Sequence, residues 1–579
     1  MRKVLQQLKQ YKRNAFLCIG MTALEVIMEI LMPFVTAIII DQGLEAANLP
    51  VVYRYGILIV AMAVLSLIFG ALAGKNAASA SAGLAANLRE AIYANIQTFS
   101  FSNIDKFSVP GLVTRMTTDI TNVQNAFMMI IRVAVRAPLN LIFSFAMCLY
   151  INVQLSWMFL IAVAFLVIVI GVIMVVTLRI FNRVFKKYDD LNASVQENVT
   201  AIRVVKAFVR EDYEDKKFSK ASNTLYKMFV KAEGLLAFNN PAMMVAVYFC
   251  IISVSWFGAQ FIVGGTLSTG DLTSLFSYIM ALLMSLMMLS MVVVMISMSL
   301  ASIRRISEVL SETPDLKDSE HPVMEVKDGQ IDFNHVNFSY KHGSGKNALS
   351  DIDLHIHSGE TIGVIGGTGS GKSSLVNLIC RLYDVDDGSV CVGGVDVRQY
   401  DTEVLRNQVS VVLQKNTLFS GSILQNLRWG NPDATEEDCI EACKAACADE
   451  FIDRMPEGYR TRIERGGNNV SGGQKQRLCI ARALLKKPKV LILDDSTSAV
   501  DTATDAEIRR AFAEKIPGTT KIIIAQRISS VESADRILVL DDGKIDAFDT
   551  HENLLKNNAI YQEIYTSQKE GGGDFDQPA

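Results

Sequence analysis

Six long apolar runs dominate the first 310 residues of this 579-residue chain. A helix needs roughly 20 apolar residues to cross the hydrocarbon core of a bilayer, and each run meets that length. Half of all residues in the chain are apolar, so the composition also favours a membrane protein. We therefore expect membrane-spanning helices at about residues 15–40, 54–78, 127–150, 155–178, 241–263 and 272–300.

The loops between these runs alternate between short and long ones. The short loops hold almost no lysine or arginine, whereas the long loops at about 79–126 and 179–240 are rich in charge. Because cytoplasmic loops carry the excess of positive charge, the long loops and both termini are predicted to lie in the cytoplasm. Apolar residues at helical spacing inside the long loops predict that the membrane helices extend beyond the bilayer.

A glycine-rich loop lies between a strand-like apolar run and a helix-like run. Glycines let backbone N–H groups close around phosphates, and the start of a helix adds its positive end. The lysine of such a loop reaches the β- and γ-phosphates, and the final hydroxyl binds Mg²⁺. The predicted phosphate loop consists of Gly366, Gly367, Thr368, Gly369, Ser370, Gly371, Lys372 and Ser373.

Two further motifs follow the phosphate loop. Asp494 ends the apolar run 490–493, where a carboxylate is suited to hold the Mg²⁺ shell. The second motif stands at a helix start and exposes N–H groups and a hydroxyl to an anion. Taken alone, the first could be a carboxylate that caps a strand and the second a helix cap. Together with the phosphate loop they predict a nucleotide site, and the second motif consists of Ser471, Gly472, Gly473 and Gln474.

With these motifs in this order and spacing, residues 330–565 resemble an ABC-family nucleotide-binding domain. The whole chain resembles one subunit of a heterodimeric bacterial ABC multidrug exporter. The resemblance implies an α-helical membrane domain of exporter type over 1–310, followed by an α/β P-loop domain. Residues 311–329 have the composition of a linker, and 566–579 that of a disordered tail. ATP and Mg²⁺ are the implied ligands, and a bacterial plasma membrane is the implied location.

The family pattern also assigns roles to single residues. Tyr340 matches the aromatic residue that stacks on adenine, and Gln414 matches the glutamine that senses Mg²⁺ and the attacking water. Residues 464–467 match the loop that touches the long cytoplasmic loops. Residues 498–501 match the D-loop, which places Asp501 among the nucleotide-binding residues.

Two positions depart from the family pattern. The family usually has a glutamate after the Mg²⁺ aspartate, but this chain has Asp495, whose carboxylate is about 1.5 Å shorter in reach; a misplacement of that order can cost about a hundredfold in rate. Gln526 stands where the family has its switch histidine, and an amide can neither carry a positive charge nor shuttle a proton. Neutral sequence drift, without any effect on function, would explain either change alone. Both changes in one site predict an ATP site that binds but hydrolyses slowly.

In this family, two ATPase domains pair head to tail. Each ATP therefore lies between the phosphate loop of one domain and the signature motif of the other, which the motif from Ser471 to Gln474 matches in this chain. The resemblance therefore implies a second, homologous half-transporter that carries the usual glutamate and histidine. The motif from Ser471 to Gln474 would complete that partner's competent site. We expect a heterodimer with one slow and one fast site.

The sixth apolar run carries a stripe of methionines. Flexible thioethers suit a surface that accepts varied apolar cargo, but ordinary helix packing explains the same stripe. The stripe consists of Met280, Met284, Met287, Met291, Met295 and Met298.

Glu25 and Glu29 lie one turn apart in the first apolar run. Carboxylates inside a membrane are costly, and such positions are often functional. The two residues could attract cationic cargo or act in gating. They could instead form structural ion pairs with Arg132 or Arg136 in the third run.

The predicted function is ATP-driven export of amphipathic, drug-like compounds by alternating access. Lipid or peptide translocation with the same machinery is one alternative, and an ATP-gated channel or sensor is another. The formal charge of −4 argues against nucleic acid as a partner. Membrane lipid and small amphipathic compounds are the expected partners beside the second subunit.

Overall fold

The computed structural model describes residues 2–340, 346–496 and 500–571. The chain divides into two compact units. The first, the helical unit, comprises residues 1–98 and 107–312, and the second, the ATPase unit, comprises residues 99–106 and 313–579.

The helical unit has six candidate membrane spans, as predicted. Each span contains one of the predicted apolar runs or most of it. They cover Lys9–Glu45, Leu49–Gln97, Val109–Ile151, Val153–Phe181, Glu211–Val263 and Thr269–Val293. The main helices of the unit are α2 (Lys12–Ile38), α3 (Leu49–Gln97), α6 (Ile120–Ile151), α7 (Val153–Thr200), α8 (Ile202–Ala207), α9 (Glu211–Ala237), α10 (Asn239–Val263) and α11 (Thr269–Val309). Shorter elements are α1 (Arg2–Gln6), η1 (Lys9–Tyr11), η2 (Ile39–Glu45), α5 (Val109–Thr114) and η3 (Arg115–Asp119).

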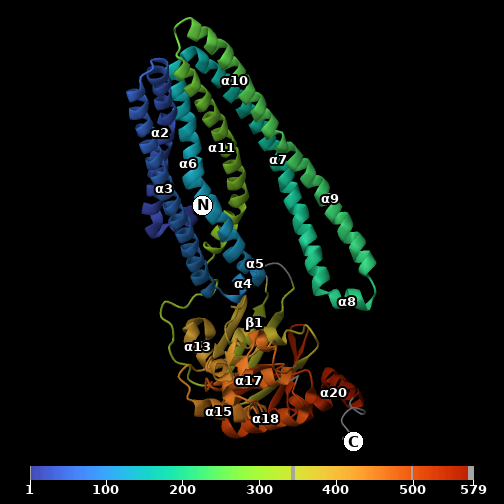
Figure 1. Cartoon of the computed structure of the whole chain (residues 1–579). Coiled ribbons are helices and arrows are strands. Elements are labelled where there is room, and N and C mark those ends of the chain that lie inside the picture. The colour runs from blue at the N-terminus through green and yellow to red at the C-terminus, as the bar shows by residue number, and fades with distance from the viewer. Residues whose placement is uncertain (1, 341–345, 497–499, 572–579) are drawn as a thin grey trace. The chain divides into compact units, whose positions relative to one another are not determined.

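Helices α2, α3, α6 and α11 pack together, while α7 runs beside α9 and α10 (Figure 1). Polar groups at the contacts of α11 with α2 bond to backbone oxygens. The Tyr278 hydroxyl donates to the carbonyl oxygen of Ile30 at 2.8 Å, and Ser274 donates to that of Pro33 at 2.6 Å. These bonds satisfy polar atoms that an apolar medium could not.

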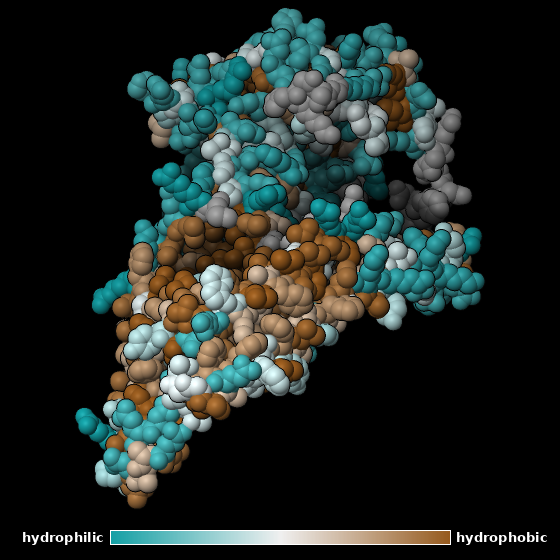
Figure 2. Space-filling view, turned by 90° about the horizontal axis from the view of Figure 1, so that it is seen from above, coloured by the Kyte–Doolittle hydropathy of each residue, from teal (hydrophilic) through white to brown (hydrophobic). Residues whose placement is uncertain are grey.

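Large apolar side chains cover the outside of the helical unit. Ile57, Ile168 and Trp256 each expose about two thirds of their surface or more, at 71, 66 and 67 %. Hydrophobic surface dominates this unit in the space-filling view, and hydrophilic residues gather at its ends (Figure 2). An apolar surface of this extent is expected of helices that face lipid.

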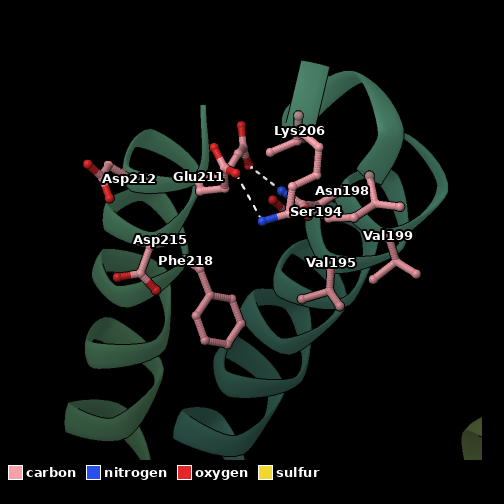
Figure 3. A pocket seen from close by; sticks show the side chains of 12 residues that line it. Ser194, Val195, Asn198, Val199, Lys206, Glu211, Asp212, Asp215 and Phe218 are labelled. Carbon is pink, nitrogen blue, oxygen red and sulfur yellow. Dashed lines mark hydrogen bonds and ion pairs between the residues drawn. The ribbon is translucent and has the colours of Figure 1, made fainter. Parts of the chain in front are cut away.

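Helices α7, α8 and α9 form a hairpin whose tip holds a cavity of about 540 Å³ (Figure 3). Lys206 forms an ion pair with Glu211 at 2.9 Å across this cavity, and Asn198 Nδ2 donates to Glu214 Oε2 at 3.1 Å. Phe208, between α8 and α9, leaves 73 % of its surface exposed, and Val199, which lines the cavity, leaves 63 %. The tip therefore presents apolar side chains that the described residues of the helical unit leave open.

The ATPase unit is built on two main sheets. A six-stranded sheet has the order β12-β11-β3-β10-β9-β6, and a four-stranded sheet has the order β2-β1-β4-β5. The strands are β1 (Ile331–Phe338), β2 (Leu349–Ile356), β3 (Thr361–Gly366), β4 (Asp387–Val392), β5 (Val395–Asp396), β6 (Val409–Val412), β7 (Gly421–Ser422), β8 (Arg462–Ile463), β9 (Val490–Asp494), β10 (Thr520–Ile524), β11 (Arg536–Asp541) and β12 (Lys544–Asp549).

Helices cover these sheets. They are α12 (Lys372–Ile379), α13 (Thr402–Gln408), α14 (Ile423–Leu427), α15 (Glu436–Ala445), α16 (Asp449–Ile452), α17 (Gly472–Leu484), α18 (Thr502–Lys515), α19 (His551–Asn557) and α20 (Ala559–Gly571). Strands β3, β6, β9, β10 and β11 run parallel, and β9 and β10 are buried along their whole length. Parallel strands place all their carboxyl ends at one edge, which is where such sheets bind ligands.

Two predicted boundaries need correction, and the predicted linker packs on one of the units. Helix α4 (Phe101–Phe107) begins inside the predicted membrane domain, but its residues up to Lys106 belong to the ATPase unit. The predicted linker packs on the same unit, because Val323 N donates to Gln399 O at 2.9 Å and Val326 is buried. The predicted disordered tail is wrong for residues 566–571, which continue α20, where the Gln568 side chain bonds to neighbouring backbone.

Candidate nucleotide site

The phosphate loop connects β3 to α12. Gly371 caps α12 with a φ of 98°, a backbone conformation that side-chain-bearing residues rarely adopt. A Cβ atom at this position would lie 2.8 Å from the carbonyl oxygen of Ala348. The glycine is therefore required both by the turn and by the close approach of another segment.

Lys372 folds back over the loop. Its Nζ donates to the carbonyl oxygens of Gly366 and Gly367, both at 2.8 Å. Burial lowers the pKa of Lys372, and the charges of Asp494 and Asp495 act against that shift. An ammonium group held at the mouth of the loop, close to two carboxylates, is placed to bind phosphate oxygens and a metal-bound phosphate.

Asp494 ends β9 and is 6 % exposed. Burial raises the pKa of this carboxyl, and a hydrogen bond from Ser373 opposes the shift. A hydroxyl and a buried carboxylate side by side are the oxygen ligands that Mg²⁺ prefers, so this pair fits the predicted metal position.

Asp495 follows directly and accepts from two amides. Gln526 Nε2, just after β10, donates to Asp495 Oδ2 at 2.8 Å, and Gln414 Nε2, just after β6, donates to the same oxygen at 3.3 Å. The Asp495 backbone has a φ of 48°, in the left-handed region that an aspartate adopts at a cost. The structure thus brings both departures from the family pattern into direct contact.

The backbone of Gln526 is held by a side chain of α20. The side-chain amide of Gln568 in α20 donates to Gln526 O at 2.7 Å and accepts from Ile528 N at 2.8 Å. This bidentate contact fixes the backbone on both sides of Arg527.

Tyr340 follows β1 and exposes 49 % of its surface. Its hydroxyl bonds to the hydroxyl of Ser374, in the first turn of α12, at 2.9 Å. An exposed aromatic ring beside the phosphate loop has the surroundings that the predicted adenine contact needs.

The signature residues cap α17 rather than joining the phosphate loop. Ser471 Oγ accepts from Gln474 N at 3.3 Å, and Gln474 Oε1 accepts from Ser471 N at 2.9 Å. Gly472 begins the helix, and no hydrogen bond among the described residues links this cap to Lys372. The residues that match the loop at 464–467 form a turn with positive φ at Gly466 and Gly467.

Asp501 caps α18 and accepts from Thr504 N at 3.0 Å. That hydrogen bond lowers the pKa of Asp501. Of the other D-loop positions, Val500 is buried, and residues 498 and 499 lie outside the described residues.

In the helical unit, Arg136 joins both intramembrane glutamates. Its guanidinium pairs with Glu25 at 2.8 Å and with Glu29 at 2.7 Å. Arg132, one turn earlier, forms no hydrogen bond or ion pair with the part of the chain that the structure describes. One oxygen of Glu25, Oε2, is buried with no partner among those residues.

The methionine stripe runs along α11. Met284, Met287 and Met291 are exposed on the helical unit, at 56, 40 and 64 %. Exposure on a single chain is compatible with contact to lipid, cargo or another subunit. The side chain of Met298 lies outside the described residues.

Sequence reasoning missed Tyr383 and Asp105. The Tyr383 hydroxyl donates to Asp105 Oδ2 at 2.9 Å, within the ATPase unit, and the Tyr383 ring lies against Tyr340 with centroids 5.1 Å apart. The two partners of Tyr383 lie far from it along the chain, and neither carries a motif that pairs it with this ring. No local signal in the sequence could have revealed these contacts.

Comparison with known proteins agrees with this geometry. The family model described as ABC transporter transmembrane region matches residues 15–287, and the model described as ABC transporter matches residues 349–498. An uncharacterized ABC transporter ATP-binding protein of Bacillus subtilis is 35 % identical over 98 % of this chain and 98 % of its own length.

Two other similarities add detail. The ATP-dependent lipid A-core flippase of Desulfotalea psychrophila is 34 % identical over 79 % of this chain and 80 % of its own length. A bacterial Atm1-family ABC exporter with ATP bound has the same fold, with a TM-score of 0.83 at 24 % identity over 96 % of this chain and 99 % of that one. The chain therefore belongs to the ABC transporter family, as an exporter half-transporter whose ATP-binding domain is that of a transport ATPase.

Proposed function

We propose that this chain is the slow-site subunit of a heterodimeric exporter that moves amphipathic compounds across the plasma membrane. In this proposal ATP binds at Tyr340 and the phosphate loop, Ser373 and Asp494 hold Mg²⁺, and Gln414 reports on the metal. The ATP at this chain's phosphate loop serves mainly to hold two ATPase domains together. Hydrolysis takes place chiefly at the site that a partner completes with the signature of this chain.

The observation that carries the proposal is the contact of Asp495 with two neutral amides. A general base must take a proton from water, and the base must reach that water. Asp495 is one methylene shorter than glutamate, and its Oδ2 already accepts from Gln526 and Gln414. Gln526 cannot become a cation that stabilises the developing charge. The site keeps its means of binding ATP but lacks the usual means of cleaving it.

A homodimer would contain this arrangement twice. An exporter that turns over at a useful rate needs one competent site, so the arrangement favours a different second chain. The exposed apolar tip of the α7–α8–α9 hairpin supports a protein partner in the cytoplasm, because large exposed apolar patches are typical of interfaces.

The test uses the purified exporter reconstituted in liposomes. Replacing Asp495 by Asn removes a charge from a group that does little chemistry, so ATP turnover is expected to change by less than about twofold. Replacing the partner's equivalent glutamate by Gln is expected to lower turnover by about a hundredfold or more. Equal losses in the two variants refute the asymmetry, as does brisk ATP-driven transport by this chain purified without a companion.

Lipid translocation is the second candidate function. It is favoured by the similarity to the ATP-dependent lipid A-core flippase over 79 % of this chain. ATP-driven movement of a fluorescent phospholipid from the outer to the inner leaflet of inside-out vesicles, compared with uptake of a cationic dye into the same vesicles, separates the two candidates. Movement of lipid without dye uptake would replace drug export by lipid export and leave the slow-site proposal intact.

A further inference from the structure

Four aromatic rings of the ATPase unit form a connected cluster beside the phosphate loop. Tyr340 lies edge-on to Phe338 at 4.9 Å and to Tyr383 at 5.1 Å between ring centroids. Phe338 is 1 % exposed and contacts Tyr383 at 5.7 Å, so one ring of the cluster is anchored in the core. Phe101 in α4 also lies against Tyr383, with ring centroids 6.2 Å apart.

Tyr383 is the central member of this cluster. It lies just after α12, whose first turn holds Ser374, the partner of the Tyr340 hydroxyl. Its own hydroxyl donates to Asp105 Oδ2 at 2.9 Å, so the orientation of its ring is fixed at both ends. Burial raises the pKa of Tyr383, and the Asp105 charge acts in the same direction, so the phenol stays protonated and able to donate.

Helix α4 is held firmly enough to impose this orientation. The Asn103 side chain accepts from Ser100 N at 3.0 Å and donates to Thr313 O at 3.3 Å, and Asn103 is 1 % exposed. Ser102 Oγ donates to Asp315 Oδ2 at 2.6 Å. Asp105 therefore acts from a fixed position.

We propose that Tyr383 and Asp105 are positioning residues for nucleotide binding: Asp105 orients the Tyr383 ring, and that ring holds Tyr340 in the place where it stacks on a nucleobase. The proposal rests on the adenine role given to Tyr340 above. It extends that role to a residue of α4, which no motif of the nucleotide site includes. The affinity for the base, and not for the phosphates, then depends on α4.

The test measures ligand affinity at this chain in the purified full-length exporter. Photolabelling by 8-azido-ATP, read on the band of this chain after electrophoresis, is competed with ATP and separately with inorganic tripolyphosphate. Tripolyphosphate binds the phosphate loop but has no base to stack. A loss of positioning therefore weakens ATP alone, whereas general damage to the fold weakens both competitors.

Tyr383→Leu is expected to weaken ATP about three- to tenfold, the range of an aromatic pair, and to leave tripolyphosphate unchanged. Tyr383→Phe keeps the ring and is expected to lose about twofold. Asp105→Ala is expected to match Tyr383→Phe, while Asp105→Asn, which keeps an acceptor, restores the affinity. Gln562→Ala in α20 is the control, because it loses a side-chain hydrogen bond of the ATPase unit, to Leu555 O, and no bond of α4 or of the aromatic cluster.

Tyr340→Ala provides the reference. It is expected to weaken ATP by about fivefold or more, as removal of a stacking ring does. If Tyr340→Ala weakens ATP and Tyr383→Leu does not, the positioning proposal is overturned and the adenine role stands. If neither variant weakens ATP, both fail. Equal weakening of ATP and tripolyphosphate by Tyr383→Leu also overturns positioning.

Discussion

Carboxylates in the two units of this molecule are bound by different kinds of group, a charged one in the first unit and neutral ones in the second. In the helical unit, Glu25 and Glu29 both pair with the Arg136 guanidinium, and Glu25 is buried. In the ATPase unit, Asp495 meets the amides of Gln526 and Gln414. Guanidinium compensates charge, whereas amides satisfy hydrogen bonds and leave the charge in place.

The difference separates two uses of a carboxylate. A compensated cluster inside a membrane braces helices, and it is costly to break because the remaining charge stays buried. An amide-bound carboxylate close to a phosphate loop keeps its hydrogen bonds but has lost the freedom to approach water. The first arrangement contributes mainly to stability and the second mainly to rate.

The largest expected effect lies in the helical unit. Arg136→Ala leaves Glu25 and Glu29 uncompensated and is expected to lower the free energy of unfolding by about 3–5 kcal/mol. Arg132 lies one turn away on α6 and pairs with no described residue. Arg132→Ala is therefore the control, and it is expected to change the free energy of unfolding by less than about 0.5 kcal/mol. Unfolding in mixed detergent micelles measures both. Equal losses would show that the pairing does not brace the helices.

The next effect concerns rate. Asp495→Glu combined with Gln526→His restores the reach of the carboxylate and a group that can carry charge. In an exporter whose partner glutamate is replaced by Gln, ATP hydrolysis at this chain's site is therefore expected to rise about ten- to a hundredfold. Either single change is expected to give much less, because the two side chains act on one water. No increase in phosphate release from the double variant would place the cause of slow hydrolysis elsewhere.

A smaller effect tests the space around Glu25. A Cβ atom at Gly70 would lie 2.9 Å from Glu25 Oε1, so Gly70→Ala is expected to destabilise the helical unit by about 1–3 kcal/mol. Gly56, on the same helix α3, has no atom within 4 Å of such a Cβ. Gly56→Ala is expected to be neutral or to stabilise by up to about 1 kcal/mol. The two variants are compared by the same unfolding assay, and similar values would contradict close packing at Gly70.

The smallest effect tests the support behind Gln526. Gln568→Ala removes two hydrogen bonds to the backbone around Arg527 and is expected to speed amide hydrogen exchange at Ile528 about fivefold, which corresponds to about 1 kcal/mol. Gln562→Ala, also in α20, removes a bond to Leu555 O and is expected to leave Ile528 unchanged. Mass spectrometry of the exchanged peptides compares the exchange rates of the two variants. Identical rates would show that Gln568 does not stabilise the backbone around Arg527.

The parts of the fold that a single segment encodes could be predicted from the sequence. Spans follow from apolar length, and the phosphate loop follows from glycines between a strand and a helix. The choice between Arg132 and Arg136 could not be made, because both lie on one helix a turn apart and only the rotation of that helix decides which one faces Glu25. The helical continuation through Gln568 was hidden by a polar composition that resembles a disordered tail.

Long-range contacts account for the rest. Tyr383 and Asp105 lie 278 positions apart in the chain, and their hydrogen bond depends on the docking of α4 in the ATPase unit. A hydrogen bond of this kind follows from the tertiary fold and leaves no periodicity in the sequence. The pairing of Asp495 with Gln526 was within reach, because both positions belong to recognised motifs at the same edge of a sheet.

The membership of residues 99–106 in the ATPase unit has a practical consequence for dissecting the molecule. A fragment that starts at residue 313 would lack Phe101 and Asp105, and Tyr383 would lose one of its ring contacts and the acceptor of its hydroxyl. Nucleotide affinities measured on such a truncated domain would then describe an incomplete protein. A synthetic peptide that spans residues 99–106, added back to the fragment, offers a direct way to recover what the cut removed.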